Sequence, residues 1–543
     1  MSKKQIVFVF FILFIAVLFR LWQLGKIPVG MTDDEIREVY SAYSVWMTGK
    51  DITRGLRLPF TFILNNFSFS PIPIYITAPF VGLFGLSPFT ARLPFALAGL
   101  GVVLLTYFLV KFLIKSQVAS VAAGICMACN VWAIQISRMA HEAVFAQLFY
   151  LWGTYIFLNN RKQKSVIKVN FALFLFFLAF NSYDATKIIL IPIVIALVIY
   201  KWKEIVMNKK ILLIIGLWVV GIFSLFGFLF ISQKAGIHGS TIFIFQNTAD
   251  AAQAVELERR ASDAPEILKI IYHNKLTYFA DQVAHHYLYA FSPDFLFLSQ
   301  EASGMFSLWS RGNLYLIELP LLIIGIFYGF LNYRKCFYLG CVMILIAVIP
   351  SGVGPAPFTY ATRSNFMLPW LSVFISFGIL SLVEQARNKF IRYSILTTIS
   401  LIYLYFVSGY ITQYYFEWSR YGAKYYSNAI KDVITLISSE KYLNRNILIS
   451  NVNDTFILQY AFYNRINPAE IQSWFARNNP MLTFRSIHII PSCLGKKDED
   501  PRKSLNQNTL YITSPSCYLE IPDKIIYSPD HEQQWYIYEN ALN

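Results

Sequence analysis

The sequence of 543 residues is poor in charge, because only 14% of its residues are aspartate, glutamate, lysine or arginine. A soluble globular protein carries about 25%. With 56% hydrophobic residues, the composition excludes a soluble domain assembly, a disordered chain and a collagen-like fibre. Only six cysteines occur, which excludes a disulfide-rich secreted scaffold. The sequence also lacks Walker, Rossmann, zinc-finger and H-E-x-x-H patterns.

The chain does contain a series of apolar runs of about 20 residues, the length that crosses a bilayer as a helix. Its mean hydropathy is +0.48. We therefore predict a polytopic, mainly α-helical membrane protein with about eleven transmembrane helices. The first is a retained helix rather than a signal peptide, because no small-x-small cleavage site follows it. The predicted spans lie near residues 6–22, 92–110, 117–136, 142–158, 169–183, 187–200, 211–231, 314–331, 337–351, 366–383 and 394–413.

The positive charge has a distinct distribution along the chain. Lysine and arginine total 46 against 31 acidic residues, an excess of +15 that would suggest nucleic acid in a soluble protein. Here the cations gather in alternate loops, as the positive-inside rule requires of cytoplasmic loops. The turns on the other side hold Arg138, Lys187 and Arg363, one each. We predict a multi-pass plasma-membrane protein with a cytoplasmic N-terminus and no nucleic-acid partner. The cytoplasmic set is the N-terminal tail with loops 111–115, 161–168, 201–210, 332–336 and 384–393.

Residues 71–87 are predicted to be a juxtamembrane or re-entrant segment on the outer side. Pro71, Pro73 and Pro79 interrupt a run that is already short for a span. Two large outer loops follow from this topology, at residues 25–90 and 233–312. Residues 1–413 would form the transmembrane domain and residues 414–543 an extracytoplasmic C-terminal domain.

The C-terminal domain is expected to be a small α/β or α+β domain. Its predicted elements are an amphipathic helix at 421–440 and strands at 447–450, 486–490, 509–513 and 535–539, with a polar surface loop at 493–508. Cys493 and Cys517 both lie in it, either as a disulfide or as two thiols. Cys126 and Cys129 form a C-x-x-C inside a predicted span, where close helix packing is favoured over metal or redox chemistry.

Three consecutive acids, Asp33, Asp34 and Glu35, follow Thr32 just outside the first span. Thr32 and Glu35 have the spacing of a capping box, and acids suit the first turn of a helix. The alternative is a general base or a metal site, because carboxylates beside an apolar phase are costly and tend to be functional. The sequence alone leaves both interpretations open.

Three further outer turns combine an acid or a phenol with a cation. The first contains Arg138, His141 and Glu142, the second Tyr183 and Lys187, and the third Arg363. Taken one at a time, these residues are first-turn charges or interfacial anchors. Taken together on one outer face, they suit an anionic substrate beside catalytic carboxylates.

His285 and His286 lie in the second outer loop, and Asp281 precedes His285 by four residues, so a helix would place both on one face. This is weak evidence for a metal. An interfacial helix rich in aromatic residues is the favoured interpretation.

The chain resembles the GT-C glycosyltransferases, in particular the dolichyl-phosphate-mannose–protein mannosyltransferase branch and the related lipid A aminoarabinose transferases. The resemblance covers about 410 residues in order, and the C-terminal domain matches only in position and size. The matching residues are Phe19-Arg20-Leu21, Asp34-Glu35, Tyr40, Ala42, Gly49, Asp51, Pro71-Ile72-Pro73-Ile74-Tyr75, Phe84-Gly85, Ala91-Arg92-Leu93-Pro94, Ser137-Arg138 with Glu142, Tyr183 with Lys187, and Arg363 before Leu368-Pro369.

The resemblance implies an inverting hexosyl or pentosyl transferase that uses a polyprenyl-phosphate sugar. Asp34 would be the catalytic acid of the family's Asp-Glu pair, and Glu35 would orient the juxtamembrane helices or share the site. Asp33 stands where an apolar or aromatic residue is usual, so it could itself be the base or a metal ligand. Glu142 would orient the acceptor or a metal.

The cations have a matching implied role. Lys187, Arg363, Arg138 and Arg92, with Tyr183, are candidates to bind the donor phosphate. No cofactor is certain. A divalent metal ion is left open, with Asp34, Glu142 and His141 as candidate ligands.

The acceptor is a protein hydroxyl, as in O-mannosylation, or alternatively lipid A, another glycolipid or a cell-wall glycan. A transporter or flippase of lipid-linked sugars is a different class, but the sequence shows no internal repeat and its charges cluster at helix ends. A scaffold with an outer sensing domain would not need acids and cations in separate turns of one face.

Overall fold

The structure is a computed structural model that describes residues 2–64, 67–160, 165–184, 186–206, 208–232, 243–246, 248–301, 303–308, 310–354, 360–453, 455–477 and 482–540. The chain divides into two units, each described here by itself. The first consists of Met1–Trp22, Phe95–Ser137 and Glu142–Tyr410, and the second of Gln23–Pro94, Arg138–His141 and Ile411–Asn543. The last segment of the second unit begins close to the predicted boundary at residue 413, but that unit also contains the first outer loop.

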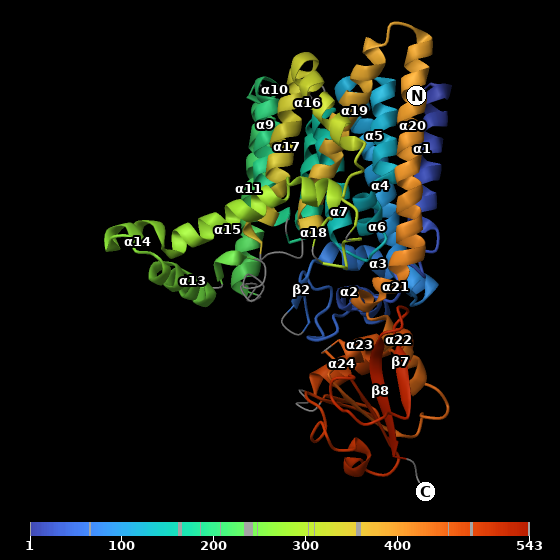
Figure 1. Cartoon of the computed structure of the whole chain (residues 1–543). Helices are drawn as coiled ribbons and strands as arrows, with labels where there is room; N and C mark the ends of the chain where they lie inside the picture. Colours follow the sequence, from blue (N-terminus) through green and yellow to red (C-terminus); the bar gives the residue numbers. More distant parts are fainter. Residues whose placement is uncertain are drawn as a thin grey trace. The chain divides into compact units, whose positions relative to one another are not determined.

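The first unit is a helical bundle. Within it α5 packs against α1 and α19, and α19 packs against α16 (Figure 1). The helices of the bundle are α1 (Lys3–Leu21), α4 (Pro88–Ile114), α5 (Gln117–Cys129), α6 (Val131–Ser137), α7 (Ala143–Leu158), α8 (Val166–Phe180), α9 (Thr186–Tyr200), α10 (Trp202–Val206), α11 (Lys209–Ser232), α16 (Glu318–Asn332), α17 (Arg334–Val353), α18 (Tyr360–Ser364), α19 (Leu368–Gln385) and α20 (Lys389–Thr412).

Each of the eleven predicted spans coincides with helical structure, so the prediction of a mainly helical membrane protein is confirmed. The number of crossings is not. Among the described residues, five helices are long and apolar enough to cross a membrane, or six if the bent pair α5 and α6 forms one span. The bend of 54° falls at Asn130, whose extended backbone ends α5 and whose side-chain oxygen accepts from Ala133 N at 2.9 Å.

Arg20 shows how this bundle accommodates a charge. Its side chain is buried near the end of α1 and donates to the carbonyl oxygens of Met127 and Ala128 at 3.0 and 2.9 Å. These carbonyls lie in the last turn of α5, where the helix itself supplies no donors. The cation therefore satisfies a helix end and complements its dipole.

The described part of the second outer loop is largely helical as far as Leu298. It contains α13 (Thr248–Ala261), α14 (Glu266–Tyr272), α15 (Lys275–Tyr289) and a π-helical turn at Asp294–Leu298. The predicted helix around His285 and His286 is α15. Residues 233–242 of this predicted loop lie outside the described residues, as do residues 355–359 of the outer turn that contains Arg363.

In the second unit, the first outer loop begins with α2 (Asp33–Thr48), continues through the hairpin β1 (Phe62–Leu64) and β2 (Phe67–Phe69), and ends in α3 (Pro71–Phe84). Residues 71–87, predicted not to cross, contain this 14-residue helix. Proline at its first position suits a helix start. α3 packs on α2 so closely that a Cβ at Gly82 would lie 2.2 Å from the Trp46 ring.

The C-terminal domain contains a six-stranded mixed sheet in the order β4-β5-β3-β6-β8-β7. Figure 1 labels its strands β7 and β8. The four predicted strands are β3 (Asn446–Ser450), β5 (Ile487–Ile490), β6 (Thr509–Thr513) and β8 (Gln533–Asn540). β3 runs parallel to β5 and β6, which makes an α/β domain of it. The prediction missed β4 (Leu482–Phe484), β7 (Lys524–Tyr527), α23 (Phe456–Tyr463) and α24 (Pro468–Ala476). The helix expected at 421–440 is the shorter α22 (Asn428–Ile437).

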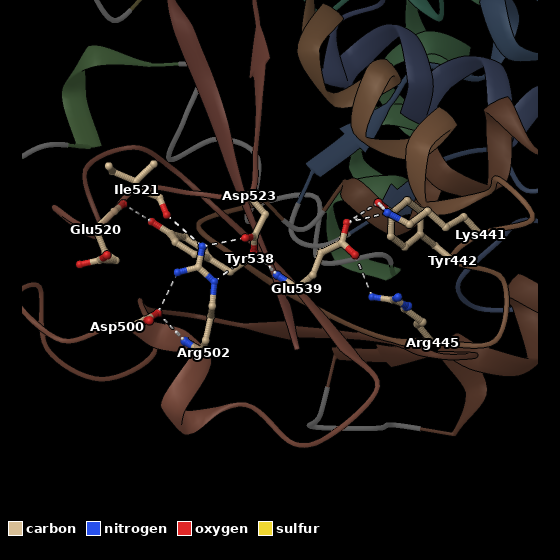
Figure 2. A network of polar contacts seen from close by, with 10 residues as sticks. All are labelled: Lys441, Tyr442, Arg445, Asp500, Arg502, Glu520, Ile521, Asp523, Tyr538 and Glu539. Carbon is tan, nitrogen blue, oxygen red and sulfur yellow. Dashed lines mark hydrogen bonds and ion pairs between the residues drawn. The ribbon is translucent and has the colours of Figure 1, made fainter. Parts of the chain in front are cut away.

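Ion pairs join β8 to the segments around it (Figure 2). Glu539 accepts from Lys441 Nζ at 3.0 Å, Tyr442 Oη at 2.5 Å and Arg445 Nη1 at 3.1 Å. Arg502 pairs with Asp500 and Asp523, and its guanidinium lies 5.0 Å from the centre of the Tyr538 ring. Because these groups are partly exposed, each pair contributes about 1 kcal/mol or less.

Cys493 and Cys517 form a disulfide, with 5.6 Å between their Cα atoms. This resolves the alternatives that the sequence left open. The bond joins the polar loop after β5 to the turn after β6. Cys517 belongs to a small buried cluster with Leu505, Tyr511 and Tyr538.

Removing this disulfide should destabilise the C-terminal domain. The double variant Cys493→Ser/Cys517→Ser is expected to lose about 2–4 kcal/mol, since the unfolded domain gains conformational freedom. Limited proteolysis of the full chain across a thermal ramp measures the loss. Cys341→Ser, which removes a free thiol, is the matched control. Equal proteolysis of all three proteins would contradict a structural role for the disulfide.

Candidate active site

The three acids after Thr32 begin α2, and the expected capping box is present. Thr32 Oγ1 accepts from Glu35 N at 3.1 Å, and Glu35 Oε2 accepts from Thr32 N at 2.9 Å. The two residues thus satisfy two of the donors that a helix start leaves open. This geometry fixes the backbone of the first turn of α2, from which the side chains of Asp33 and Asp34 extend.

Glu35 also forms a buried ion pair with Arg92. Its carboxylate accepts from Arg92 Nε at 2.8 Å and from Nη2 at 3.0 Å. The side chains of Arg92 and Glu35 are 0% and 1% exposed. A buried pair of charges is tolerated only where the remaining hydrogen-bonding positions are satisfied. The surrounding backbone meets this condition.

Backbone groups from two further segments complete the pair. Arg92 donates to the carbonyl oxygens of Pro28 at 2.8 Å and Gly30 at 2.6 Å. Glu35 Oε1 accepts from Ala140 N at 2.9 Å. The pair therefore joins the chain before α2, the start of α4 and the short turn that follows α6.

Gly30 is required in this arrangement. Its φ is +84°, and a Cβ there would lie 2.2 Å from the carbonyl oxygen of Tyr426. Only glycine combines this backbone conformation with so close an approach. The loop that leads to the acids is thus packed against the C-terminal part of its own unit.

Asp33 and Asp34 differ in their surroundings. Asp34 is 69% exposed at its side chain and pairs with Arg37 Nη1 at 3.3 Å. Asp33 is half-buried and accepts from the side-chain amides of Asn453 and, at 2.8 Å, Gln459. Asp34 is accessible to a substrate, whereas Asp33 ties α2 to the C-terminal domain.

Arg138 and His141 lie in the short turn whose Ala140 N–H meets Glu35. Arg138 is buried, donates to Ile27 O at 2.8 Å, and lies 5.0 Å from the centre of the Tyr415 ring. This is a cation–π contact of the kind that holds a guanidinium in place. Burial lowers the pKa of His141 to about 4, with the Glu35 charge opposing only part of that shift, so its imidazole is neutral at pH 7.

The other predicted residues belong to the first unit. Tyr183 Oη donates to Thr362 Oγ1 at 3.3 Å, and the charge of the neighbouring Arg363 acts on it. Burial raises the pKa of Tyr183 to about 12, so it remains a hydrogen-bond donor. Lys187 pairs with Asp184 and is partly exposed. The structure thus brings Tyr183 and Arg363 together.

Glu142 lies just before α7, and its carbonyl oxygen accepts from Phe145 N at 3.1 Å, as an ordinary helix start requires. Its charge acts on Tyr183. Asp34 and Glu142 belong to different units. Among the described residues no group of three or more histidine, cysteine, aspartate or glutamate side chains could hold a metal ion.

Sequence reasoning missed three polar residues near these groups. Asn453 and Gln459 bind Asp33 although they are more than 400 positions away in the chain, a distance at which no spacing rule operates. Glu301 is a lone acid in the second outer loop and is 2% exposed. A single glutamate among aromatic residues gives no pattern, so only burial could have identified it.

Comparisons with known proteins bear on this arrangement. The family described as dolichyl-phosphate-mannose-protein mannosyltransferase matches residues 68–227. ArnT from Cupriavidus metallidurans in the apo state has a similar fold, with a TM-score of 0.50 and 11% identity over 98% of this chain and 97% of that chain. The same protein bound to undecaprenyl phosphate gives a TM-score of 0.49 and 12% identity over the same shares. An oligosaccharyltransferase from Archaeoglobus fulgidus, in complex with Zn and sulfate, gives 0.46 and 12% over 98% of this chain and 73% of that chain. A search of curated protein sequences found no significant match.

The family match and the shared fold support the resemblance to a GT-C superfamily glycosyltransferase that the sequence predicts. The matched segment contains Arg92, Arg138, Glu142, Tyr183 and Lys187. Asp34 and Arg363 lie outside it, so their roles rest on their own residues and geometry.

The buried ion pair makes a testable prediction about stability. Arg92→Gln should cost about 3–5 kcal/mol of unfolding free energy, because it leaves the Glu35 carboxylate buried and uncompensated. The double variant Arg92→Gln/Glu35→Gln should lose less than the sum of the two single changes. Unfolding of the purified protein in mixed detergent micelles gives these values.

A matched control is Arg485→Gln, which removes the cation of an exposed pair with Glu470. It should stay within about 1 kcal/mol of the parent protein. Additive losses from the Arg92 and Glu35 changes would show that the two side chains act independently.

Proposed function

We propose that this chain is an inverting glycosyltransferase that moves a sugar from a polyprenyl-phosphate donor to an acceptor hydroxyl at the extracytoplasmic face. The observation that carries the proposal is the exposed carboxylate of Asp34 on a helix start fixed by the buried Glu35–Arg92 pair. A catalytic base needs access to substrate and a fixed direction. The match to the dolichyl-phosphate-mannose-protein mannosyltransferase family supports the reaction class.

The proposed reaction is one displacement. The acceptor hydroxyl oxygen forms a bond to the anomeric carbon of the sugar while Asp34 takes the hydroxyl proton. The bond between that carbon and the phosphate oxygen breaks, and polyprenyl phosphate leaves with the electron pair. Attack from the face opposite the leaving group inverts the anomeric configuration, through a transition state with oxocarbenium character.

The donor is proposed from two lines of support. The matching family is named for dolichyl-phosphate-mannose as its donor and protein as its acceptor. In the first unit, Arg363 lies beside the hydroxyl group of Tyr183, which donates hydrogen bonds. The partly exposed Lys187 lies in the same outer turn as Tyr183. An arginine fork and a neighbouring phenol suit the oxygens of a phosphate, and their charge would stabilise the departing group.

The remaining predicted residues receive different roles in this proposal. Arg92 and Arg138 are buried and already bound to backbone oxygens, so we assign them to positioning the loop rather than to the phosphate. Asp33 joins α2 to the C-terminal domain through Asn453 and Gln459. Glu142 keeps its proposed role in orienting the acceptor. No step is routed through a metal.

The sugar and the acceptor are narrower proposals. Mannose and a protein hydroxyl come first, since the matching family is named for them. A glycolipid or cell-wall glycan is the alternative acceptor. The proposed orientation, with the N-terminus in the cytoplasm and the C-terminal domain outside, rests on the distribution of lysine and arginine among the loops.

The role of Asp34 is tested by Asp34→Asn. Because the amide cannot take the acceptor proton, kcat should fall by about 10²–10⁴. The KM for the donor should change little, since the proposed phosphate contacts are Arg363, Tyr183 and Lys187. Transfer assays on purified protein measure both constants.

Asp33→Asn is the matched control, because it is the same chemical change one residue away. It should weaken the contact with Gln459 and lower stability while kcat stays within about tenfold. Full turnover in Asp34→Asn together with lost turnover in Asp33→Asn would move the base to Asp33.

A further inference from the structure

The guanidinium of Arg363 lies directly against the backbone of Gly354. A Cβ at Gly354 would lie 1.4 Å from Arg363 Nη1. The φ of Gly354 is −81°, an angle open to any residue, so space rather than backbone conformation is what requires glycine here. The end of α17 thus provides the surface on which the Arg363 side chain rests.

His286, in α15, contacts the same backbone surface at Gly354. Its Nδ1 lies 3.2 Å from the carbonyl oxygen of Gly354, and its side chain is buried. Burial lowers the pKa of His286, and the charges of His285 and Arg363 lower it further, against the opposing effect of the carbonyl. The imidazole is therefore neutral, and Nδ1–H donates to Gly354 O.

Glu301 holds the start of α18, the short helix that carries Arg363. Its Oε2 accepts from Ala361 N at 2.7 Å. Its Oε1 is buried and has no hydrogen-bond partner among the residues that the structure describes. Arg363 is the cation whose charge acts on this carboxyl group.

Aromatic packing completes the contact between the second outer loop and this helix. The ring of Tyr360 lies 4.9 Å from that of Tyr289, 6.1 Å from that of His286 and 6.1 Å from that of Phe295. Such ring contacts are rigid and add to the burial of apolar surface. Residues of one loop thereby hold the backbone at Gly354 and at Ala361, both of which precede Arg363 in the chain.

We infer that His286 and Glu301 are positioning residues, through which the second outer loop aims the Arg363 guanidinium at the donor phosphate. This inference rests on the proposed function, which makes Arg363 a phosphate ligand. A bidentate contact between a guanidinium and a phosphate requires a defined direction as well as a charge. His286 fixes the surface under the guanidinium, and Glu301 fixes the helix from which it extends.

The test compares variants that move Arg363 without removing it. Gly354→Ala, Glu301→Ala and His286→Leu should each raise the KM for the donor about 10- to 100-fold, since small misplacements of a binding group cost this much. The KM for the acceptor should change little. The same variants should bind undecaprenyl phosphate, the probe used in nanodiscs, more weakly by the same factor.

Conservative variants distinguish positioning from general damage. Glu301→Gln keeps an oxygen that accepts from Ala361 N, and His286→Asn keeps an N–H that can donate to Gly354 O. Both should retain donor KM within about threefold. His285→Leu is the matched control, since that histidine is exposed on the same helix. Equal losses in conservative and truncating variants would overturn the positioning roles.

The pH dependence gives a second readout. Burial raises the pKa of Glu301 to about 8, against the opposing effects of two backbone N–H groups and of Arg363. Below this pH the Glu301 carboxyl group is neutral, and the Arg363 charge is available to the phosphate. Above this pH the Glu301 carboxylate competes with the phosphate for Arg363. Tyr289 and Tyr360 also face Glu301 and are neutral in this range. Affinity for undecaprenyl phosphate should therefore fall as the pH rises through about 8, and Glu301→Gln should remove that fall.

Arg363→Ala separates failure of the inference from failure of the proposed function. If it leaves donor KM and undecaprenyl phosphate binding unchanged, Arg363 is no phosphate ligand and the proposed function loses that element. If it weakens both while Gly354→Ala, Glu301→Ala and His286→Leu do not, the phosphate role holds and the positioning inference is wrong.

Discussion

The ion pair between Glu35 and Arg92 is the interaction on which the candidate active site depends. Two opposite charges with 0% and 1% exposure would be costly alone, but backbone groups occupy their remaining hydrogen-bonding positions. The same carboxylate completes the capping box at the start of α2. One glutamate therefore fixes the helix start, and with it the direction of its exposed neighbour Asp34.

The C-terminal domain contributes to the same arrangement. Its Asn453 and Gln459 bind Asp33, and Gly30 packs against the backbone of Tyr426, so the C-terminal domain binds the start of α2 in addition to Arg92. In the first unit the second outer loop binds the start of the helix that carries Arg363, because Glu301 accepts a hydrogen bond from Ala361 N. In both units the group proposed to meet substrate is supported by residues from distant parts of the chain. This division between contacting and supporting residues is what preorganised chemistry requires.

Local patterns predicted a large part of this structure. Apolar runs located the helices, the Thr32–Glu35 spacing predicted the capping box, and the short strand-like runs after residue 413 predicted the main strands of the C-terminal sheet. What could not be predicted was long-range pairing. Glu35 and Arg92 are 57 positions apart, and neither residue alone indicates in the sequence that the other is its partner. Glu301 could not be identified either, because a lone acid indicates no partner. The short edge strands β4 and β7 have too few residues to show alternation.

The central claim is that sugar moves from a lipid phosphate to a hydroxyl. The most direct measurement incubates the purified full chain in nanodiscs with a panel of polyprenyl-phosphate sugars and with protein and glycolipid acceptors. Mass spectrometry and anomeric NMR then follow the products. We expect that one donor is consumed, that polyprenyl phosphate is released, and that the acceptor gains one sugar with inverted configuration. Transfer from a nucleotide sugar instead, or retention of configuration in the product, would contradict it.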